Sequence, residues 1–259
     1  MTVLIETVGV TKHYGDYVAL NGVTLSVGDG EMLSIVGPNG AGKTTLVNVL
    51  TGLLKPTAGL VRFKGDDIAG IGPVKLAKRG MARAFQLVHI FPEMTVAETI
   101  GVAVISQTGR SLDFFSSLAG DGAVREKVRD VAAIFGLDGK LDTPSRLLSQ
   151  GEKKLLDIAS AFALVPEVIL LDEPTSGVAS GDKHGIMKTL LDAAKRAGVK
   201  AIILVEHDMD LVAEYSTRIV AIQAGRVLAD AVPADFFSDP ELIATIVGKP
   251  VAQHAVRTR

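Results

Sequence analysis

Hydrophobic positions along the chain repeat with two different periods, which predicts strands interleaved with helices. Three short runs are apolar except for Ser34 and have the length of strands buried on both faces: Met32–Val36, 168–171 and Ala201–Val205. Elsewhere the apolar spacing becomes helical, as in the stripe from Val124 to Phe135, which has charged residues on its other side. Buried strands alternating with amphipathic helices predict an α/β fold with a mostly parallel sheet.

The remaining elements follow from turn and cap residues. Residues 3–27 alternate with period two and predict strands broken at Gly15 and Gly22. Further along we expect a strand at 60–63, a turn at 64–67, a helix near 73–79, a strand at 81–86, helices within 94–136 around a Ser/Gly-rich excursion at 106–122, a helix from Ser149 that Pro166 ends, a helix at 183–196, a hairpin of 218–222 with 226–229, and helix from 234 onward.

A glycine-rich segment joins the first buried strand to a helical stretch. Residues 37–45 read Gly-Pro-Asn-Gly-Ala-Gly-Lys-Thr-Thr and match G-x-x-x-x-G-K-[ST]. Glycines let backbone N–H groups converge on phosphate oxygens, and the following helix turns its positive end to the same anion. A chance match is the alternative, but the flanking strand and helix argue against it. The predicted nucleotide contacts are Gly37, Pro38, Asn39, Gly40, Ala41, Gly42, Lys43, Thr44 and Thr45.

Two acids follow the buried run 168–171. Asp172 and Glu173 stand at the mouth of an apolar strand, where unpaired burial is costly. Beside a phosphate-binding loop, Asp172 and the Thr44 hydroxyl suit Mg²⁺ ligation, and Glu173 suits a base for water. His207 follows the next buried strand, and position alone leaves a structural and a functional role open.

Three other polar or aromatic positions are ambiguous from spacing alone. Tyr14 precedes a turn glycine and is either a core anchor or a nucleotide contact. Gln86 ends a predicted strand and either caps the sheet edge or acts in the site. Ser149 with Glu152 forms a capping box, which is an ordinary helix cap or the start of a second anion site.

Length, net charge, cysteine content and hydrophobic runs narrow the possible classes of protein. The 259 residues can form one large α/β domain, and the net charge of −2 without a long basic block predicts no nucleic-acid partner. The absence of cysteine excludes disulfides and thiolate metal sites. The start lacks a basic region, so we expect no signal peptide, and uncharged runs stop at about eleven residues, short of the roughly twenty that span a bilayer. We therefore expect a soluble protein whose link to a membrane, if any, runs through a partner.

Taken in order, these motifs resemble the ATPase subunit of an ABC transporter over almost the whole chain. Residues 37–45 match Walker A, 148–152 the signature motif, and 168–173 Walker B with its terminal glutamate. Gln86 falls at the position of the Q-loop, His207 at that of the switch histidine, and Tyr14 at that of the aromatic residue that stacks on adenine.

A narrower resemblance is to the ATPases of branched-chain amino acid importers. It rests on residues 82–86, 91–96 and 205–209 and on the excursion at 106–122. Two departures from the wider family stand out. The signature reads Leu-Ser-Gln-Gly-Glu, although Ser149 and Gly151 are kept, and residues 176–179 lack the aspartate usual in the D-loop.

The resemblance implies a single ABC ATPase domain over 1–259. A P-loop NTPase (RecA-like) core with an antiparallel β subdomain would occupy 1–87 and 155–259, and a helical subdomain 88–154. It also implies ATP and Mg²⁺ as cofactors, with the metal held by Thr44, Gln86 and Asp172.

The resemblance further implies a shared site. Two cassettes, in a homodimer or a heterodimer with a paralogous ATPase, would sandwich two ATPs, with Ser149 and Gly151 of one subunit on the γ-phosphate bound by the other. Glu173 would polarise water, and His207 would hold the water and the γ-phosphate. Gln86 would sense the metal and pass the change to residues 87–95, which would touch a membrane subunit.

The implied partners are two integral membrane permeases and, indirectly, a periplasmic substrate-binding protein. The chain would be cytoplasmic, peripheral on the cytoplasmic face of the inner membrane.

The leading alternative is a non-transport cassette ATPase that acts on nucleic acid or the ribosome. Three features argue against it: the single cassette, the lack of a long coiled-coil insertion and the lack of a basic surface signal. A P-loop kinase would not need the Ser149 motif, and a GTPase would need an Asn-Lys-x-Asp motif that the sequence lacks.

Overall fold

Two β-sheets organise the chain, seen here in a computed structural model that describes residues 2–85, 91–108 and 121–247. The larger sheet has six strands in the order β10-β9-β3-β8-β7-β6, and the smaller has four in the order β2-β1-β4-β5. The strands are β1 (Val3–Tyr14), β2 (Tyr17–Gly28), β3 (Met32–Val36), β4 (Ala58–Phe63), β5 (Asp66–Asp67), β6 (Met81–Arg83), β7 (Val168–Asp172), β8 (Ala201–Val205), β9 (Arg218–Gln223) and β10 (Arg226–Ala231).

The larger sheet is parallel from β9 to β6, and β10 closes it as an antiparallel hairpin with β9. Its strands separate two hydrophobic clusters. Ile169 and Leu171 face the helical cluster, whereas Val168 and Leu170 face the cluster shared with the smaller sheet. Burial on both faces explains why β7 up to Leu171 and the whole of β8 are continuously apolar rather than alternating.

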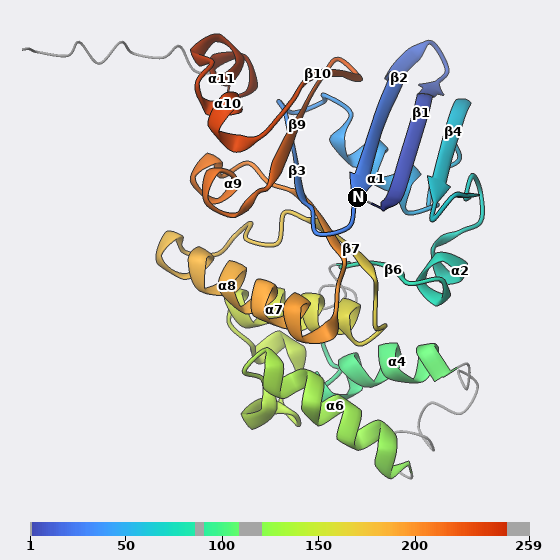
Figure 1. Cartoon of the computed structure of the whole chain (residues 1–259). Coiled ribbons are helices and arrows are strands. Elements are labelled where there is room, and N and C mark those ends of the chain that lie inside the picture. Colours follow the sequence, from blue (N-terminus) through green and yellow to red (C-terminus); the bar gives the residue numbers. More distant parts are fainter. Residues whose placement is uncertain (1, 86–90, 109–120, 248–259) are drawn as a thin grey trace, which may run out of the picture.

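Helices cover both faces of the larger sheet (Figure 1). The described helices are α1 (Lys43–Leu50), α2 (Pro73–Lys78), α4 (Val96–Thr108), α6 (Gly122–Ile134), α7 (Gln150–Phe162), α8 (Ser180–Ala197), α9 (Met209–Tyr215), α10 (Pro233–Phe237) and α11 (Pro240–Val247), with short 3₁₀ turns at Asp138–Lys140 and Ser145–Leu147. In Figure 1, α4 and α6 form the lower part of the molecule, and α7 and α8 lie between them and the sheet.

The α/β prediction is confirmed, as are the three buried strands, the helix that starts at Ser149 and the hairpin of β9 and β10. The predicted stripe from Val124 to Phe135 is buried. Some local predictions were wrong. Residues 66–67 form the short strand β5 rather than part of a turn, β6 ends at Arg83, and α7 ends at Phe162, before Pro166.

Gly22 was the other error, because it lies inside β2 and does not break it. The pairs Val10↔Val23 and Lys12↔Leu20 show that β2 has one extra residue there, and Gly22 has φ +73°. This is a β-bulge, in which a glycine takes up the left-handed conformation while the ladder continues on both sides.

The proposed division of the chain into 1–87 with 155–259 and 88–154 stays a prediction. Its second boundary falls within α7, and α7 packs on both α4 and α8. Among the described residues, no helix has the length and hydrophobicity to cross a membrane.

Candidate functional site

Three groups of predicted site residues lie at the carboxyl ends of three adjacent parallel strands. Strand β8 pairs with β3 on one side and with β7 on the other, and Val205 is in register with both Ile35 and Asp172. The glycine loop after β3, the acids at the end of β7 and the histidine after β8 therefore leave the sheet at one edge. This is where open parallel sheets bind ligands.

The glycine loop passes against backbone atoms, which excludes side chains at two positions. A Cβ on Gly37, whose φ is +150°, would lie 2.1 Å from the carbonyl oxygen of Ile222. A Cβ on Gly42, at φ +108°, would lie 2.5 Å from the carbonyl oxygen of Ala19. The matched glycines are thus required by the conformation of the loop, and Gly42 leads directly into α1.

Lys43 is a buried cation at the first position of α1, only 7% exposed. Its Nζ donates to the carbonyl oxygens of Gly37 at 2.7 Å and Pro38 at 3.0 Å. Burial lowers the pKa of Lys43, and the negative charges of Glu173 and then Asp172 partly offset that change. The lysine and both acids therefore share one electrostatic environment, and Thr44, the residue after Lys43, is exposed.

The structure brings Glu173 and His207 into contact. His207 Nε2 and Glu173 Oε1 are 2.9 Å apart, and both side chains are somewhat more than 40% exposed. Glu173 has φ +50°, a left-handed conformation that is rare for a residue with a side chain. Its N–H donates to the carbonyl oxygen of Val205 at 2.9 Å, which ties the end of β7 to the end of β8.

Asp172 has a partner that the sequence did not reveal. Arg83, at the end of β6, donates from one terminal nitrogen to Asp172 Oδ2 at 2.8 Å and from the other to Asn48 Oδ1 at 2.6 Å. The arginine side chain is 10% exposed and its Nε has no hydrogen-bond acceptor in the described part of the chain. Its guanidinium also lies 5.3 Å from the centre of the Phe85 ring.

Glu206 is a second unforeseen residue, buried at 3% exposure. Its Oε1 accepts from the Thr175 hydroxyl at 2.6 Å and from the Thr175 N–H at 3.2 Å. Its Oε2 accepts from the His207 N–H at 3.1 Å. One carboxylate therefore holds both the segment after Glu173 and the residue that contacts Glu173.

The capping box at the start of α7 is present as predicted. The Ser149 Oγ accepts from the Glu152 N–H at 3.3 Å, and the Glu152 carboxylate accepts from the Ser149 N–H at 2.9 Å. No hydrogen bond between described residues joins Ser149 or Gly151 to the glycine loop. A different residue of α7 does reach the site: Lys154 Nζ donates to the Glu173 carbonyl oxygen at 3.0 Å.

Tyr14 ends β1 and is half exposed, so it is not a buried core anchor. It pairs across the hairpin with Tyr17, whose hydroxyl donates to the carbonyl oxygen of Gly40 at 3.3 Å. This contact ties the hairpin that carries Tyr14 to the glycine loop. Gln86, predicted to act in catalysis and metal binding, lies outside the described residues.

The donor set fits a nucleotide and a magnesium ion. Within the described residues no cluster of three or more His, Asp or Glu side chains forms a metal site by itself. Mg²⁺ is commonly held by one or two carboxylates together with substrate phosphates, so one acid and one hydroxyl beside a phosphate-binding loop are sufficient. Asp172 keeps Oδ1 outside its bond to Arg83, and Thr44 is exposed.

A strand, a glycine loop that excludes a side chain at two positions, a buried lysine at a helix start and two successive acids at the end of a nearby strand define a P-loop nucleotide-binding ATPase. The sequence pattern of the ABC transporter family matches residues 20–176. The chain belongs to this family, among its ATP-binding subunits.

Individual relatives agree over nearly the full length. The high-affinity branched-chain amino acid transport ATP-binding protein BraF of Pseudomonas aeruginosa is 33% identical over 253 residues, which cover 95% of this chain and 98% of that protein. A nucleotide-free ATP-binding cassette from an ABC transporter superposes with a TM-score of 0.84 at 31% identity, covering 95% and 100% of the two chains. A dimeric cassette in a post-hydrolysis state, bound to ADP and Pi, gives 0.74 at 25% identity, covering 89% and 99%.

Proposed function

We propose that this chain powers an importer of branched-chain or related amino acids by binding and hydrolysing MgATP between two cassettes. The observation that carries the proposal is the Glu173–His207 contact at the strand ends that also hold Lys43 and Asp172. The similarity to BraF, a branched-chain amino acid transport protein, supports the cargo class.

Each residue has a proposed part in binding or hydrolysing the nucleotide. The loop 37–42, Lys43 and the N–H groups at the start of α1 would bind the β- and γ-phosphates. Thr44, Asp172 and Gln86 would hold Mg²⁺, which neutralises phosphate charge. Glu173 would accept a hydrogen bond from the attacking water, and His207 would orient both the water and the Glu173 carboxylate.

Ser149 and Gly151 serve the nucleotide of a second cassette in this proposal. They begin α7 on a surface that makes no hydrogen bond to the chain's own loop among the described residues, and a related cassette forms a dimer with ADP and Pi. A charge-assisted hydrogen bond is worth about 1.5–3 kcal/mol. Two or three per γ-phosphate at two sites exceed the ~5.5 kcal/mol that moves a two-state equilibrium from 1:99 to 99:1.

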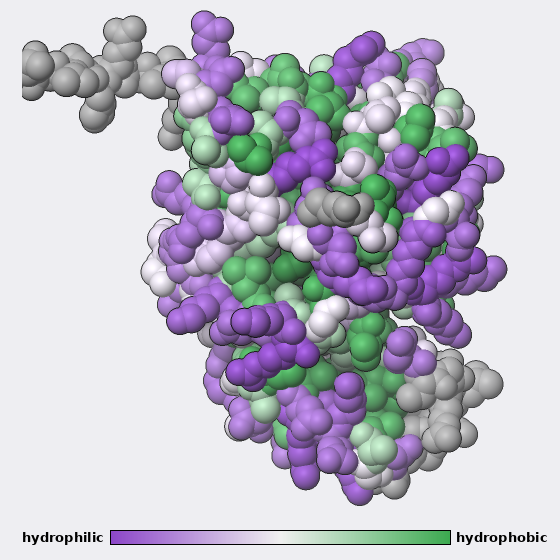
Figure 2. Space-filling view, viewed as in Figure 1, coloured by the Kyte–Doolittle hydropathy of each residue, from purple (hydrophilic) through white to green (hydrophobic). Residues whose placement is uncertain are grey.

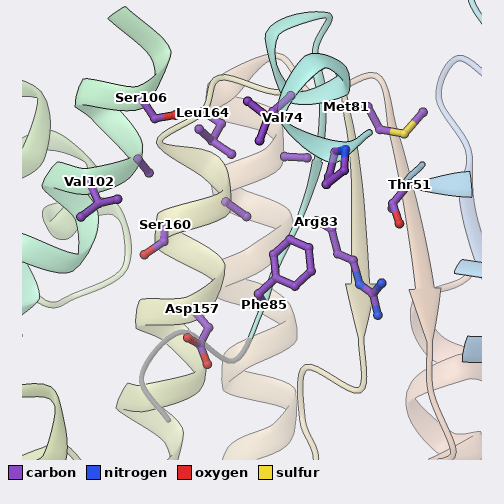
Figure 3. Close-up of a pocket in the computed structure, with 15 residues that line it drawn as sticks. Thr51, Val74, Met81, Arg83, Phe85, Val102, Ser106, Asp157, Ser160 and Leu164 are labelled. Carbon is purple, nitrogen blue, oxygen red and sulfur yellow. The ribbon is translucent and has the colours of Figure 1, made fainter. Parts of the chain in front are cut away.

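A groove beside the site suits a membrane partner. The space of about 330 Å³ lies between α2, β6, α4 and α7, and its lining is mainly apolar, with Val74, Phe85, Val102 and Leu164 facing it (Figure 3). Figure 2 shows hydrophobic side chains between the upper and the lower helical part of the molecule. Arg83 lines the groove and also binds Asp172, so a permease segment seated there would lie one side chain from the metal ligand.

The proposed assembly therefore has two cassettes and two permeases, with a periplasmic binding protein as an indirect partner. The cassettes would lie on the cytoplasmic face of the inner membrane. The second cassette is either another copy of this chain or a paralogue.

The test is the variant Glu173→Gln. It keeps the size of the side chain but removes the carboxylate, so ATP binding should persist, turnover should fall at least a hundredfold, and ATP should drive stable dimers. Size-exclusion chromatography with light scattering measures the dimer, and phosphate release measures turnover. Glu241→Gln, which changes an exposed acid on α11, is the matched control. Wild-type turnover in Glu173→Gln would refute the assignment.

A further inference from the structure

Lys154 connects the signature helix to the predicted base. It lies half-buried on α7, and its Nζ donates to the carbonyl oxygen of Glu173 at 3.0 Å and to the Ser176 Oγ at 3.1 Å. These two acceptors lie on the turn after β7. The contact thus joins α7 to the backbone of Glu173 itself, not to its side chain.

The backbone of Glu173 needs such support. A non-glycine residue at φ +50° persists only where the surrounding contacts hold it. Its N–H is held by Val205 on β8, and its carbonyl oxygen accepts from the Ser176 N–H at 3.1 Å and from Lys154. Of these contacts, only the one with Lys154 comes from a helix outside the strand ends. A shift of α7 would therefore act on the backbone of Glu173 through this contact.

The position of Lys154 on α7 places its contact with Glu173 close to Ser149 at the start of the same helix. Ser149 caps the start of the helix, and Lys154 is five residues further on, about 7.5 Å along the axis at 1.5 Å per residue. In the proposed dimer, Ser149 engages the nucleotide held by the partner's loop, whereas Glu173 acts on the nucleotide of its own chain. About one and a half turns of α7 therefore separate Ser149, which engages the partner's nucleotide, from Lys154, which contacts Glu173.

We propose that Lys154 is a positioning residue that couples the two ATP sites of the dimer. Engagement of the partner's nucleotide at Ser149 fixes α7, and Lys154 then fixes the backbone of Glu173 in its active orientation. This inference rests on the proposed shared site.

The experiment compares Lys154→Met with Lys154→Arg and with the control Lys153→Met. Methionine keeps the aliphatic stem but removes the donors, and arginine keeps a cation that can reach a carbonyl oxygen. Lys153, one residue earlier on α7, has no side-chain hydrogen bond within the described part of the chain. Steady-state ATPase kinetics give kcat, KM and the Hill coefficient, a fluorescent ATP analogue gives the nucleotide affinity, and thermal melts establish that each variant folds.

Lys154→Met should lower kcat about ten- to a hundredfold, because a misplacement of about 1 Å has effects of that size, with nucleotide affinity within twofold of wild type. Its Hill coefficient should fall to about 1. Lys154→Arg should recover kcat to within about threefold, and Lys153→Met should behave as wild type.

An unchanged kcat and Hill coefficient in Lys154→Met would overturn the inference. So would a fall in nucleotide affinity that matches the fall in kcat, or an equal effect of Lys153→Met. Failure of the shared site itself is recognised separately, since Glu173→Gln would then form no ATP-dependent dimer even with Lys154 intact.

Discussion

Glu206 offers a sharp test of how the site is held together. Glu206→Gln preserves shape, and its amide oxygen can still accept both bonds from Thr175. In the wild-type protein the His207 N–H donates to Glu206 Oε2 at 3.1 Å. In the variant the amide nitrogen takes the place of that oxygen, so two donors face each other beside a buried side chain. The variant loses one charge-assisted bond, worth about 1.5–3 kcal/mol, and leaves a buried donor unpaired at about 1–3 kcal/mol.

The two costs overlap, so we expect a loss of about 2–4 kcal/mol in the free energy of unfolding. For a chain of this size that lowers Tm by about 4–16 °C. Because His207 and the turn after Glu173 lose their common anchor, kcat should also fall by about tenfold. Differential scanning calorimetry and phosphate release measure the two effects.

Glu241→Gln is the control, because Glu241 is exposed on α11, and it should leave Tm within about 1 °C of wild type. A Glu206→Gln protein with wild-type Tm and kcat would show that the buried carboxylate does not hold the two strand ends.

Two further predictions concern the adenine contact and acid stability. Tyr14→Ala should weaken ATP binding by roughly five- to 150-fold, the range of one aromatic stack of about 1–3 kcal/mol, with little change in turnover at saturation. The control Tyr17→Phe loses only the bond to Gly40 and should change the affinity less. If Tyr14→Ala and wild type bind a fluorescent nucleotide with equal affinity in a titration, stacking by Tyr14 is ruled out. Hydrogen bonds from Lys200 and Lys64 lower the pKa of Glu167 from 4.5, so its contribution to stability is complete above that pH and is lost as the pH falls through the lower folded value. Glu167→Gln should therefore lower Tm at pH 7, and the difference from wild type should shrink below pH 4 in thermal melts; a difference independent of pH would contradict the ion-pair account.

Local sequence signals predicted much of the fold. The strands at 32–36 and 201–205 were predictable because every residue in them is buried, which leaves a mainly apolar run in the sequence. The start of α7 at Ser149 was predictable because a capping box is a purely local arrangement. Gly22 failed as a break because pairing with β1 on both sides outweighs the turn preference of one glycine.

The chemistry was predictable only where a motif fixes spacing. The contacts of Arg83, Lys154 and Glu206 join residues 89, 19 and 31 positions apart, and no periodicity says which carboxylate or carbonyl a distant charge will meet. The one available signal was a charged residue directly after a buried strand, which singles out Glu206 beside His207. Lys154 looked like any exposed lysine near a helix start.

The central claim is that each ATP lies between the glycine loop of one cassette and the Ser149 helix of another. In a Glu173→Gln background, Lys43→Ala removes one half of every site and Ser149→Arg the other half. Energy transfer between donor-labelled Lys43→Ala chains and acceptor-labelled Ser149→Arg chains is the direct measurement, because a mixed dimer restores one complete site. We predict ATP-dependent transfer in the mixture and ATP-independent monomers in either variant alone. No transfer in the mixture, while the Glu173→Gln parent dimerises with ATP, would contradict the claim.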